Sequence, residues 1–149
     1  MDRLSADVRR ALMARIRSKN TAPEMTVRST AHQLGYRFRL HRRDLPGTPD
    51  LVFPRLGLAL FVHGCFWHRH EGCRRASTPR TRREFWAAKF ERNLRRDLEA
   101  REGLHAIGWR TAVVWECECR DGERLAALLA GILQGPSRGT SHVPIASLK

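Results

Sequence analysis

The chain has 149 residues, of which 42% are hydrophobic, and its 28 basic residues against 15 acidic ones give a formal net charge of +13. This length suits one domain with a single sizeable core, and the hydrophobic content excludes a disordered polycation. No apolar run reaches membrane-spanning length and the first residues lack the apolar core of a signal peptide, so we expect a cytoplasmic protein with no membrane contact.

Arginine carries almost all of the positive charge, because only three of the basic residues are lysine. Such an excess predicts a polyanionic partner, and nucleic acid is the commonest polyanion that basic domains bind. Charge indicates binding alone and says nothing about catalysis, and genomic base composition also contributes to an arginine bias.

Two helices are predicted at the start of the chain. Apolar residues recur at every fourth position from Val8 to Ile16, which predicts a basic amphipathic helix over about residues 5–17. A second helix is expected over residues 21–35, where Thr21 can cap the first turn and a glycine can end the last one.

Three short strands are predicted next. Apolar residues alternate with basic ones from Tyr36 to His41, which is the pattern of a half-exposed strand. The turn LPGTPD leads into a short strand over residues 50–53, and the turn PRLG leads into a buried strand over residues 58–64.

A long helix, a strand and a closing helix follow. We expect the long helix over residues 81–103, the buried strand over residues 109–117 and the closing helix over residues 122–135. The core face of the long helix is predicted to be its apolar residues at four-residue spacing, namely Trp86, Phe90, Leu94 and Leu98.

The alternation of helices and strands predicts an α/β fold with a mixed central sheet flanked by helices. We place a single domain at residues 1–135. Residues 136–149 show no periodicity and are expected to form a flexible tail.

The stretch LALFVHGCFWHRHEGC turns an apolar strand into a dense group of metal-binding residue types. Cys65, His70 and Cys73 form a compact set, and cysteines in a chain without an export signal bind zinc more often than they form disulfides. Either Cys117 or Cys119 could supply the fourth ligand from the end of a neighbouring strand. The simpler interpretation is a set of buried, unligated cysteines beside a surface histidine.

A four-coordinate zinc site of this kind leaves His63 and His68 unused. Imidazole titrates near neutrality, so both are candidates for acid–base catalysis, although a lone histidine is more often hydrogen-bonded or exposed. Asp50 follows Pro49 at the start of one strand, next to the strand that runs into His63. Metal-dependent nucleases often place a Pro-Asp there to hold Mg²⁺, which stabilises charge on the phosphate and activates water. Alone, Pro-Asp usually marks a turn.

Five motifs, in order along the chain, resemble those of the very-short-patch (Vsr) mismatch repair endonucleases. They are MARIRSKNTAPE, LPGTPDLVF, VHGCFWHRHEGC, EFWAAKFERNLRRD and GWRTAVVWEC, and together they span Met13 to Cys117. The resemblance implies a restriction-endonuclease-like fold with a structural zinc site. It also implies an Mg²⁺-dependent endonuclease that nicks one strand beside a T:G mismatch, which arises when 5-methylcytosine deaminates, and so initiates very-short-patch repair.

The resemblance further implies the partners and the place of action. The expected partners are double-stranded DNA with a T:G mismatch and the general mismatch-repair proteins, and a monomer would act in the cytoplasm at the nucleoid. Two other interpretations stay open. The chain could be a zinc-stabilised DNA-binding protein without catalysis, which would need no Asp50 or spare histidines, or a nuclease of the same fold that acts on intact duplex.

The implied catalytic residues lie in three of the motifs. Asp50 would bind the catalytic Mg²⁺ directly, together with the main-chain carbonyl of Val62. His68 would be the general base for the attacking water, and His63 would be directed toward the waters of the metal or the phosphate. Glu24 matches a carboxylate that contacts those waters, although Thr-Ala-Pro-Glu is also a capping box in which the glutamate caps its own helix.

The resemblance also selects a set of zinc ligands. They are Cys65, His70, Cys73 and Cys117. Compared with many relatives, this chain has one extra residue between the last histidine and the second cysteine of the loop. Some relatives have threonine in place of Val62, which is compatible with a role for its carbonyl alone.

The resemblance implies DNA contacts in two places, the predicted N-terminal helix and the loop from Cys65 to Cys73, which we call the zinc loop. Met13, Phe66 and Trp67 correspond to residues that wedge into the duplex beside the mismatch, where a mismatched step costs less to open. Burial of the two aromatic residues in the core is the alternative. Because Met13 belongs to the predicted N-terminal helix, we expect residues 1–20 to contact DNA.

A polar row lies on the predicted long helix, one position away from its apolar row. Lys89 and Asn93 resemble residues that contact the mismatch, and Asp97 would hydrogen-bond a catalytic histidine. A solvated helix face is the simpler interpretation of this row.

Overall fold

The computed structural model describes residues 20–135, so Met13, the helix predicted over residues 5–17 and the tail predicted over residues 136–149 lie outside it. In chain order the elements are α2 (Ala22–Gln33), β1 (Arg39–Leu40), β2 (Leu51–Phe53), η1 (Pro54–Leu56), β3 (Leu58–His63), α3 (Arg83–Ala106), β4 (Arg110–Trp115), η2 (Glu116–Cys119) and α4 (Gly122–Leu133). None of these helices is both long and apolar enough to cross a membrane.

The strands form a four-stranded sheet in the order β1-β2-β3-β4 within the described residues. The first two pairings are antiparallel, and β3 runs parallel to β4 with six residue pairs, from Leu58 opposite Arg110 to His63 opposite Trp115. The predicted α/β class with a mixed central sheet is therefore confirmed. Because β3 and β4 are parallel, the segments that follow them leave the sheet at the same edge.

The strand predicted from Tyr36 to His41 is reduced to the two residues of β1. His41 adopts a left-handed backbone conformation with φ +46°, which ends the regular ladder with β2. Its amide still donates to the Asp50 carbonyl at 3.2 Å. As a result, His41 lies directly opposite Asp50, at the point where the segments of β1 and β2 separate.

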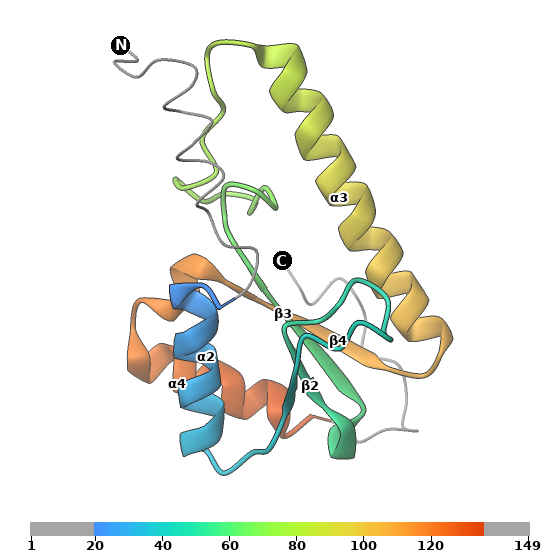
Figure 1. Cartoon of the computed structure of the whole chain (residues 1–149). Coiled ribbons are helices and arrows are strands. Elements are labelled where there is room, and N and C mark those ends of the chain that lie inside the picture. Colours follow the sequence, from blue (N-terminus) through green and yellow to red (C-terminus); the bar gives the residue numbers. More distant parts are fainter. Residues whose placement is uncertain (1–19, 136–149) are drawn as a thin grey trace.

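Helices cover both faces of the sheet (Figure 1). On one face α2 and α4 enclose the larger core cluster, made of Val27, Ala31, Leu51, Phe53, Leu58, Leu60, Ala112, Val114, Leu125, Leu129 and Leu133. On the other face the C-terminal half of α3 covers the smaller cluster, made of Leu45, Val52, Ala59, Phe61, Ala100, Leu104 and Trp109. Helix α2 matches its prediction and is capped by Thr21, whose hydroxyl accepts from the Glu24 amide.

The predicted core face of α3 is wrong in its second half. Leu94 and Leu98 are 46% and 42% exposed, and the buried residues of the helix are Phe90, Ala100 and Leu104. The helix extends well beyond the sheet (Figure 1), so only its C-terminal turns lie on the core. An apolar row at four-residue spacing therefore marks a helix here without identifying the side that is covered.

This assignment predicts different costs for two leucine truncations. Leu129→Ala should lower the free energy of unfolding by about 2–5 kcal/mol, because it leaves a cavity in the larger core cluster. Leu94→Ala should change it by no more than about 0.5 kcal/mol, because its side chain is largely exposed. Urea denaturation followed by circular dichroism measures both values. Similar losses of stability in the two variants would mean that Leu94 is part of the core after all.

Candidate functional site

An open cleft with a volume of about 810 Å³ lies between the middle of α3, the end of β3 and the segment that leads into β2. Six of the residues predicted from the sequence line it: Asp50, Val62, His63, His68, Asn93 and Asp97. Arg43 and Arg96 also line the cleft, so a phosphate that entered it would meet guanidinium groups.

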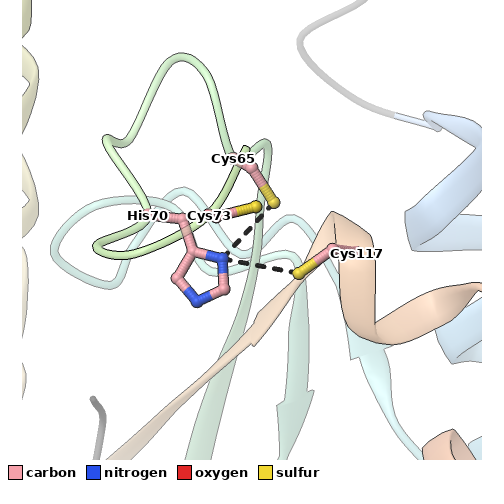
Figure 2. A group of neighbouring side chains, drawn as sticks. All are labelled: Cys65, His70, Cys73 and Cys117. Atoms are coloured by element: carbon pink, nitrogen blue, oxygen red, sulfur yellow. Dashed lines mark hydrogen bonds between the residues drawn. The ribbon is translucent and has the colours of Figure 1, made fainter. Parts of the chain in front are cut away.

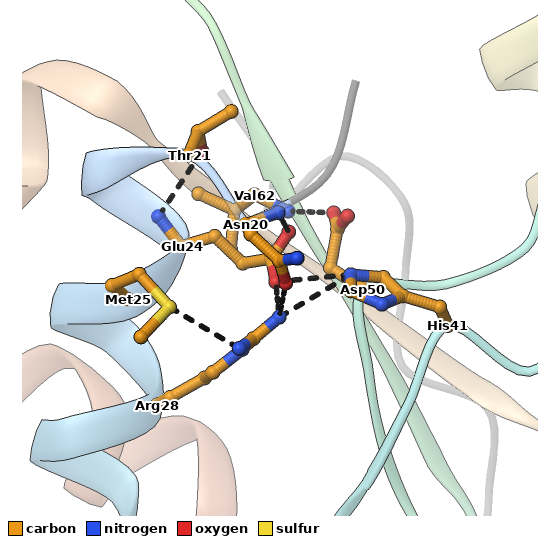
Figure 3. Close-up of polar contacts among 8 residues, drawn as sticks. All are labelled: Asn20, Thr21, Glu24, Met25, Arg28, His41, Asp50 and Val62. Atoms are coloured by element: carbon orange, nitrogen blue, oxygen red, sulfur yellow. Dashed lines mark hydrogen bonds and ion pairs between the residues drawn. The ribbon is translucent and has the colours of Figure 1, made fainter. Parts of the chain in front are cut away.

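Asp50 lies at the base of this cleft, immediately before β2, and its Oδ2 accepts a hydrogen bond from the Val62 backbone amide at 2.7 Å. Burial raises the pKa of Asp50 to about 6, and this value includes the opposing hydrogen bond from Val62, which lowers it, and the negative charge of nearby Glu24, which raises it. Ligand atoms of Asp50, Glu24 and His41 all lie within 4.8 Å of one another (Figure 3). The buried carboxylate of Glu24 and the half-buried carboxylate of Asp50, beside an imidazole, form a donor set that fits a divalent cation.

Glu24 is only 1% exposed, and both of its carboxylate oxygens are engaged. Oε1 accepts from the Asn20 amide at 3.2 Å, while Oε2 contacts the Arg28 guanidinium and lies 3.0 Å from His41 Nε2. Half of the predicted capping box is present, because the Thr21 hydroxyl accepts from the Glu24 amide at 3.4 Å. The glutamate side chain instead turns toward Asp50, which joins the helix terminus to the cleft.

Two histidines and an aspartate form a second polar group in the same cleft. The rings of His63 and His68 stack with centroids 3.8 Å apart, and His68 Nδ1 lies 2.7 Å from Asp97 Oδ2. Burial is the main cause that lowers the pKa of His63 to about 3, so His63 is neutral at physiological pH. The carboxylate of Asp97 holds the proton of His68 on Nδ1, which makes Nε2 the basic nitrogen.

The four predicted zinc ligands meet in one cluster, with their ligand atoms within 4.8 Å of one another (Figure 2). His70 Nδ1 lies 3.6 Å from Cys65 Sγ and 3.4 Å from Cys117 Sγ. Tetrahedral zinc with bonds of about 2.3 Å to sulfur and about 2.0 Å to nitrogen would separate such atoms by about 3.5 Å. The donor set and its spacing therefore fit zinc.

Cys119 lies outside this cluster, because β4 ends at Trp115 and the chain turns into η2. Its Sγ donates to the Trp115 carbonyl at 3.6 Å. The strand predicted to continue to Cys117 would have put both cysteines on the same face, and the turn separates them. Between His70 and Cys73 the chain turns at Gly72, which has φ +73° and no heavy atom, other than those of its chain neighbours, within 4 Å of the position of a Cβ.

The aromatic residues of the zinc loop pack against the N-terminal half of α3. Phe66 and Trp67 are half-buried, and the Phe66 ring meets Trp86 and Phe90 edge-on at 5.6 and 5.3 Å. Neither Phe66 nor Trp67 belongs to the two core clusters, so the predicted alternative of burial in the core is not what the fold shows. The polar row of α3 supports this group.

Lys89 and Asn93 face the same aromatic group instead of forming a solvated surface. The Lys89 Nζ lies 5.1 Å from the centre of the Trp67 ring, and Asn93 Nδ2 donates to the Trp67 carbonyl at 3.3 Å. Together with Asp97, which holds His68, the polar row of α3 connects the aromatic loop to the cleft.

Arg69 fastens the loop internally and was not identified from the sequence. Its guanidinium donates to the carbonyls of Phe66, Ala76 and Ser77 at 2.9–3.3 Å and lies 4.0 Å from the centre of the Phe90 ring. One side chain thus satisfies backbone carbonyls that come before and after His70 and Cys73 in the sequence, and it also packs against Phe90 of α3.

Arg28 and His41 are the other site residues that sequence reasoning missed. The spacing of Glu24 and Arg28, four residues apart on one helix, is a recognisable signal for an ion pair. His41 has no local signal, because the pairing of β1 with β2 brings it to Asp50.

Comparison with known proteins relates these residues to a family. The family model of the DNA mismatch endonuclease Vsr matches residues 1–75. A type II nicking enzyme of Xanthomonas oryzae pv. oryzae, V.XorIIP, is 58% identical over 132 residues, covering 89% of this chain and 96% of the relative. The DNA mismatch endonuclease Vsr of Escherichia coli is 40% identical over 113 residues, covering 76% and 72%. The nicking enzyme V.NmeAIP of Neisseria meningitidis is 35% identical over 120 residues, covering 80% and 85%. With the motifs, the cleft and these relatives in agreement, the chain belongs to the Vsr family of DNA endonucleases.

Proposed function

We propose that the protein nicks one strand of double-stranded DNA beside a T:G mismatch in an Mg²⁺-dependent reaction. Relatives at 58% and 40% identity are named as a nicking enzyme and a mismatch endonuclease. The observation that carries the proposal is one cleft that holds both the carboxylate of Asp50 and the hydrogen-bonded pair His68–Asp97. A carboxylate that can take a hard cation and an imidazole that can take a proton are the two components that phosphodiester hydrolysis needs.

Asp50 is the residue we assign to direct binding of Mg²⁺, with the Val62 carbonyl and Glu24 beside it. Bound there, Mg²⁺ would stabilise the negative charge that develops on the phosphate and favour ionisation of the attacking water. The raised pKa of Asp50 supports this assignment, because a buried carboxylate next to a second one gains most from a cation. We also propose that the chain has a restriction-endonuclease-like fold, in one domain over residues 1–135.

His68 is the residue we assign as general base. Asp97 accepts from its Nδ1, which leaves Nε2 to take the proton of the water and stabilises the imidazolium that forms. His63 stacks on the His68 ring and, because it stays neutral, adds no positive charge that would oppose this protonation. Its position in the cleft also supports an orienting contact to the phosphate.

We assign mismatch selection to Phe66 and Trp67, the half-buried aromatic residues of the zinc loop, with Met13 as a further residue that inserts into the duplex. A wobble pair is easier to unstack than a matched one, so insertion of Phe66 and Trp67 would itself discriminate. Lys89 and Asn93 support this role through their contacts with Trp67. Zinc held by the Cys/His cluster would be structural and would keep the aromatic pair at a fixed distance from His68.

A nicking assay tests the proposed function. End-labelled duplexes that differ only in a T:G or a C:G pair are incubated with the protein and Mg²⁺, or with EDTA. We expect a single-strand nick in the T:G duplex with Mg²⁺ alone, since the reaction needs both the weakened step and the metal. Equal nicking of both duplexes would instead indicate a nuclease that acts on intact DNA.

Two substitutions connect that activity to the cleft. Asp50→Ala should abolish nicking and retain DNA binding, because it removes a metal ligand and a negative charge near the phosphate. His68→Ala should slow the single-turnover rate by about 100-fold or more, the usual scale for loss of a general base. A wild-type rate for His68→Ala would mean that another group takes the proton.

The wedge assignment predicts a selective loss in Trp67→Ala. Stacking of a base on an aromatic side chain contributes about 1–3 kcal/mol, so nicking of T:G duplexes should fall by about 5- to 150-fold. Binding to matched DNA should change little, because arginine contacts to phosphate supply it. Leu94→Ala, an exposed residue of the same region, serves as the control. Parallel losses in nicking and in matched-DNA binding would show that Trp67 serves packing alone.

The zinc assignment predicts that replacing Cys73 and replacing Cys119 have different effects on metal content and stability. Protein purified without added metal should contain about one zinc per chain by elemental analysis. Cys73→Ser should lose the metal and much of its folding free energy, whereas Cys119→Ser should keep both because its sulfur lies outside the cluster. Loss of zinc from Cys119→Ser, or a fully folded wild type without zinc, would contradict this.

A further inference from the structure

The two carboxylates at the proposed metal site differ in how the protein engages them. The hydrogen bond to Asp50 comes from the Val62 backbone amide, a neutral donor. Glu24 contacts the Arg28 guanidinium in an ion pair, in which the Arg28 side chain is 15% exposed and the Glu24 side chain 2% exposed. Attraction between such buried opposite charges is little screened by water. The negative charge of Glu24 is therefore already compensated inside the protein.

The position of the Arg28 nitrogen is also informative (Figure 3). Besides Glu24 Oε2, its Nη2 lies 2.5 Å from Asn20 Oδ1 and 3.5 Å from His41 Nε2. A carboxylate oxygen, an amide oxygen and an imidazole nitrogen are the ligand types that divalent cations use in proteins. One guanidinium nitrogen thus lies where these donors converge.

We propose that Arg28 is an internal counter-ion of the metal site, which competes with the divalent cation for Glu24 and keeps metal affinity low in the DNA-free protein. This inference rests on the proposed metal site at Asp50. With Glu24 compensated, Asp50 is the carboxylate left to attract the cation. Mg²⁺ commonly takes its remaining ligands from substrate phosphates, so a weak site in free protein becomes a complete one when DNA enters the cleft.

Metal binding to the DNA-free protein tests this directly. Titration with Mn²⁺, followed by the electron paramagnetic resonance signal of the free ion, gives the dissociation constant. Arg28→Met should bind Mn²⁺ about tenfold more tightly than wild type or better, because it leaves the charge of the Glu24 carboxylate uncompensated and available to the cation. Arg28→Lys keeps the charge and should stay within about twofold of wild type.

A matched control is available on α3. Arg95 pairs with Glu91 at the same four-residue spacing, at 3.2 Å, but with side chains 66% and 72% exposed. Arg95→Met removes the same charge from the protein and should leave Mn²⁺ affinity unchanged. If it tightens binding as much as Arg28→Met, net charge and not the local pair sets the affinity, and the proposal is wrong.

The contribution of Glu24 is isolated by a double-mutant cycle. Measured against Glu24→Gln alone, Arg28→Met combined with Glu24→Gln should show no gain in affinity, because the carboxylate that Arg28 released is no longer charged. A gain that persists in the double variant overturns the proposal, as does wild-type affinity in Arg28→Met. Arg28→Gln, which keeps a polar side chain next to Glu24, replaces Arg28→Met if circular dichroism shows that the latter does not fold.

Asp50→Asn separates failure of this inference from failure of the proposed function. If it abolishes Mn²⁺ binding while Arg28→Met binds like wild type, the metal site stands and the counter-ion role fails. If Asp50→Asn binds Mn²⁺ as tightly as wild type, the metal site assigned to the cleft is itself wrong, and with it the basis of the counter-ion.

Discussion

The parallel pairing of β3 with β4 is the constraint on which the functional part of the molecule depends. Its register places His63 opposite Trp115 at the last pair of the ladder. Cys65 lies two residues after His63, and Cys117 lies two residues after Trp115. The segments that follow β3 and β4 therefore leave the sheet side by side and bring the two sulfurs into one cluster. A shift in this register would separate the members of the Cys/His cluster and also move His63 out of the cleft.

The second organising feature is the amount of charge that the cleft keeps away from water. The protein compensates each buried group differently: Arg28 lies against Glu24, Asp97 against His68, and Asp50 has mainly a backbone amide. Burying a charge without a partner is costly, and Asp50 bears that cost in the free protein through a raised pKa. A site that is incomplete in this sense is ready to accept a cation together with a substrate.

Much of this arrangement was predictable from the sequence, because short-range chemistry determines it. The Thr21 cap, the strand patterns and the compact set of Cys65, His70 and Cys73 are local signals, and the family motifs added Asp50 and the two histidines that line the cleft. Features that depend on long-range packing were not predictable. Periodicity located α3 but gave it a core face that includes Leu94 and Leu98, since the helix continues past the sheet it would have covered.

The same limit applies to the details of the site. Nothing near His41 in the sequence indicates that it faces Asp50, because strand pairing across the β1–β2 turn produces that contact. The choice between Cys117 and Cys119 depended on where β4 stops, and strand ends are the least regular part of a hydrophobic pattern. Arg69 uses three backbone carbonyls, and no side-chain pattern records such partners.

The stretch between His70 and Cys73 has a consequence for how such a gene can change. Glu71 and Gly72 are exposed, and the left-handed turn at Gly72 has open space around it. The backbone amide of Cys73 donates to the His70 carbonyl at 3.3 Å across this turn, and the side chains of both residues belong to the Cys/His cluster. A residue inserted at this turn would enter open space and would not displace the sheet. We therefore expect a longer turn here to cost the fold less than an insertion in β3 or β4 would.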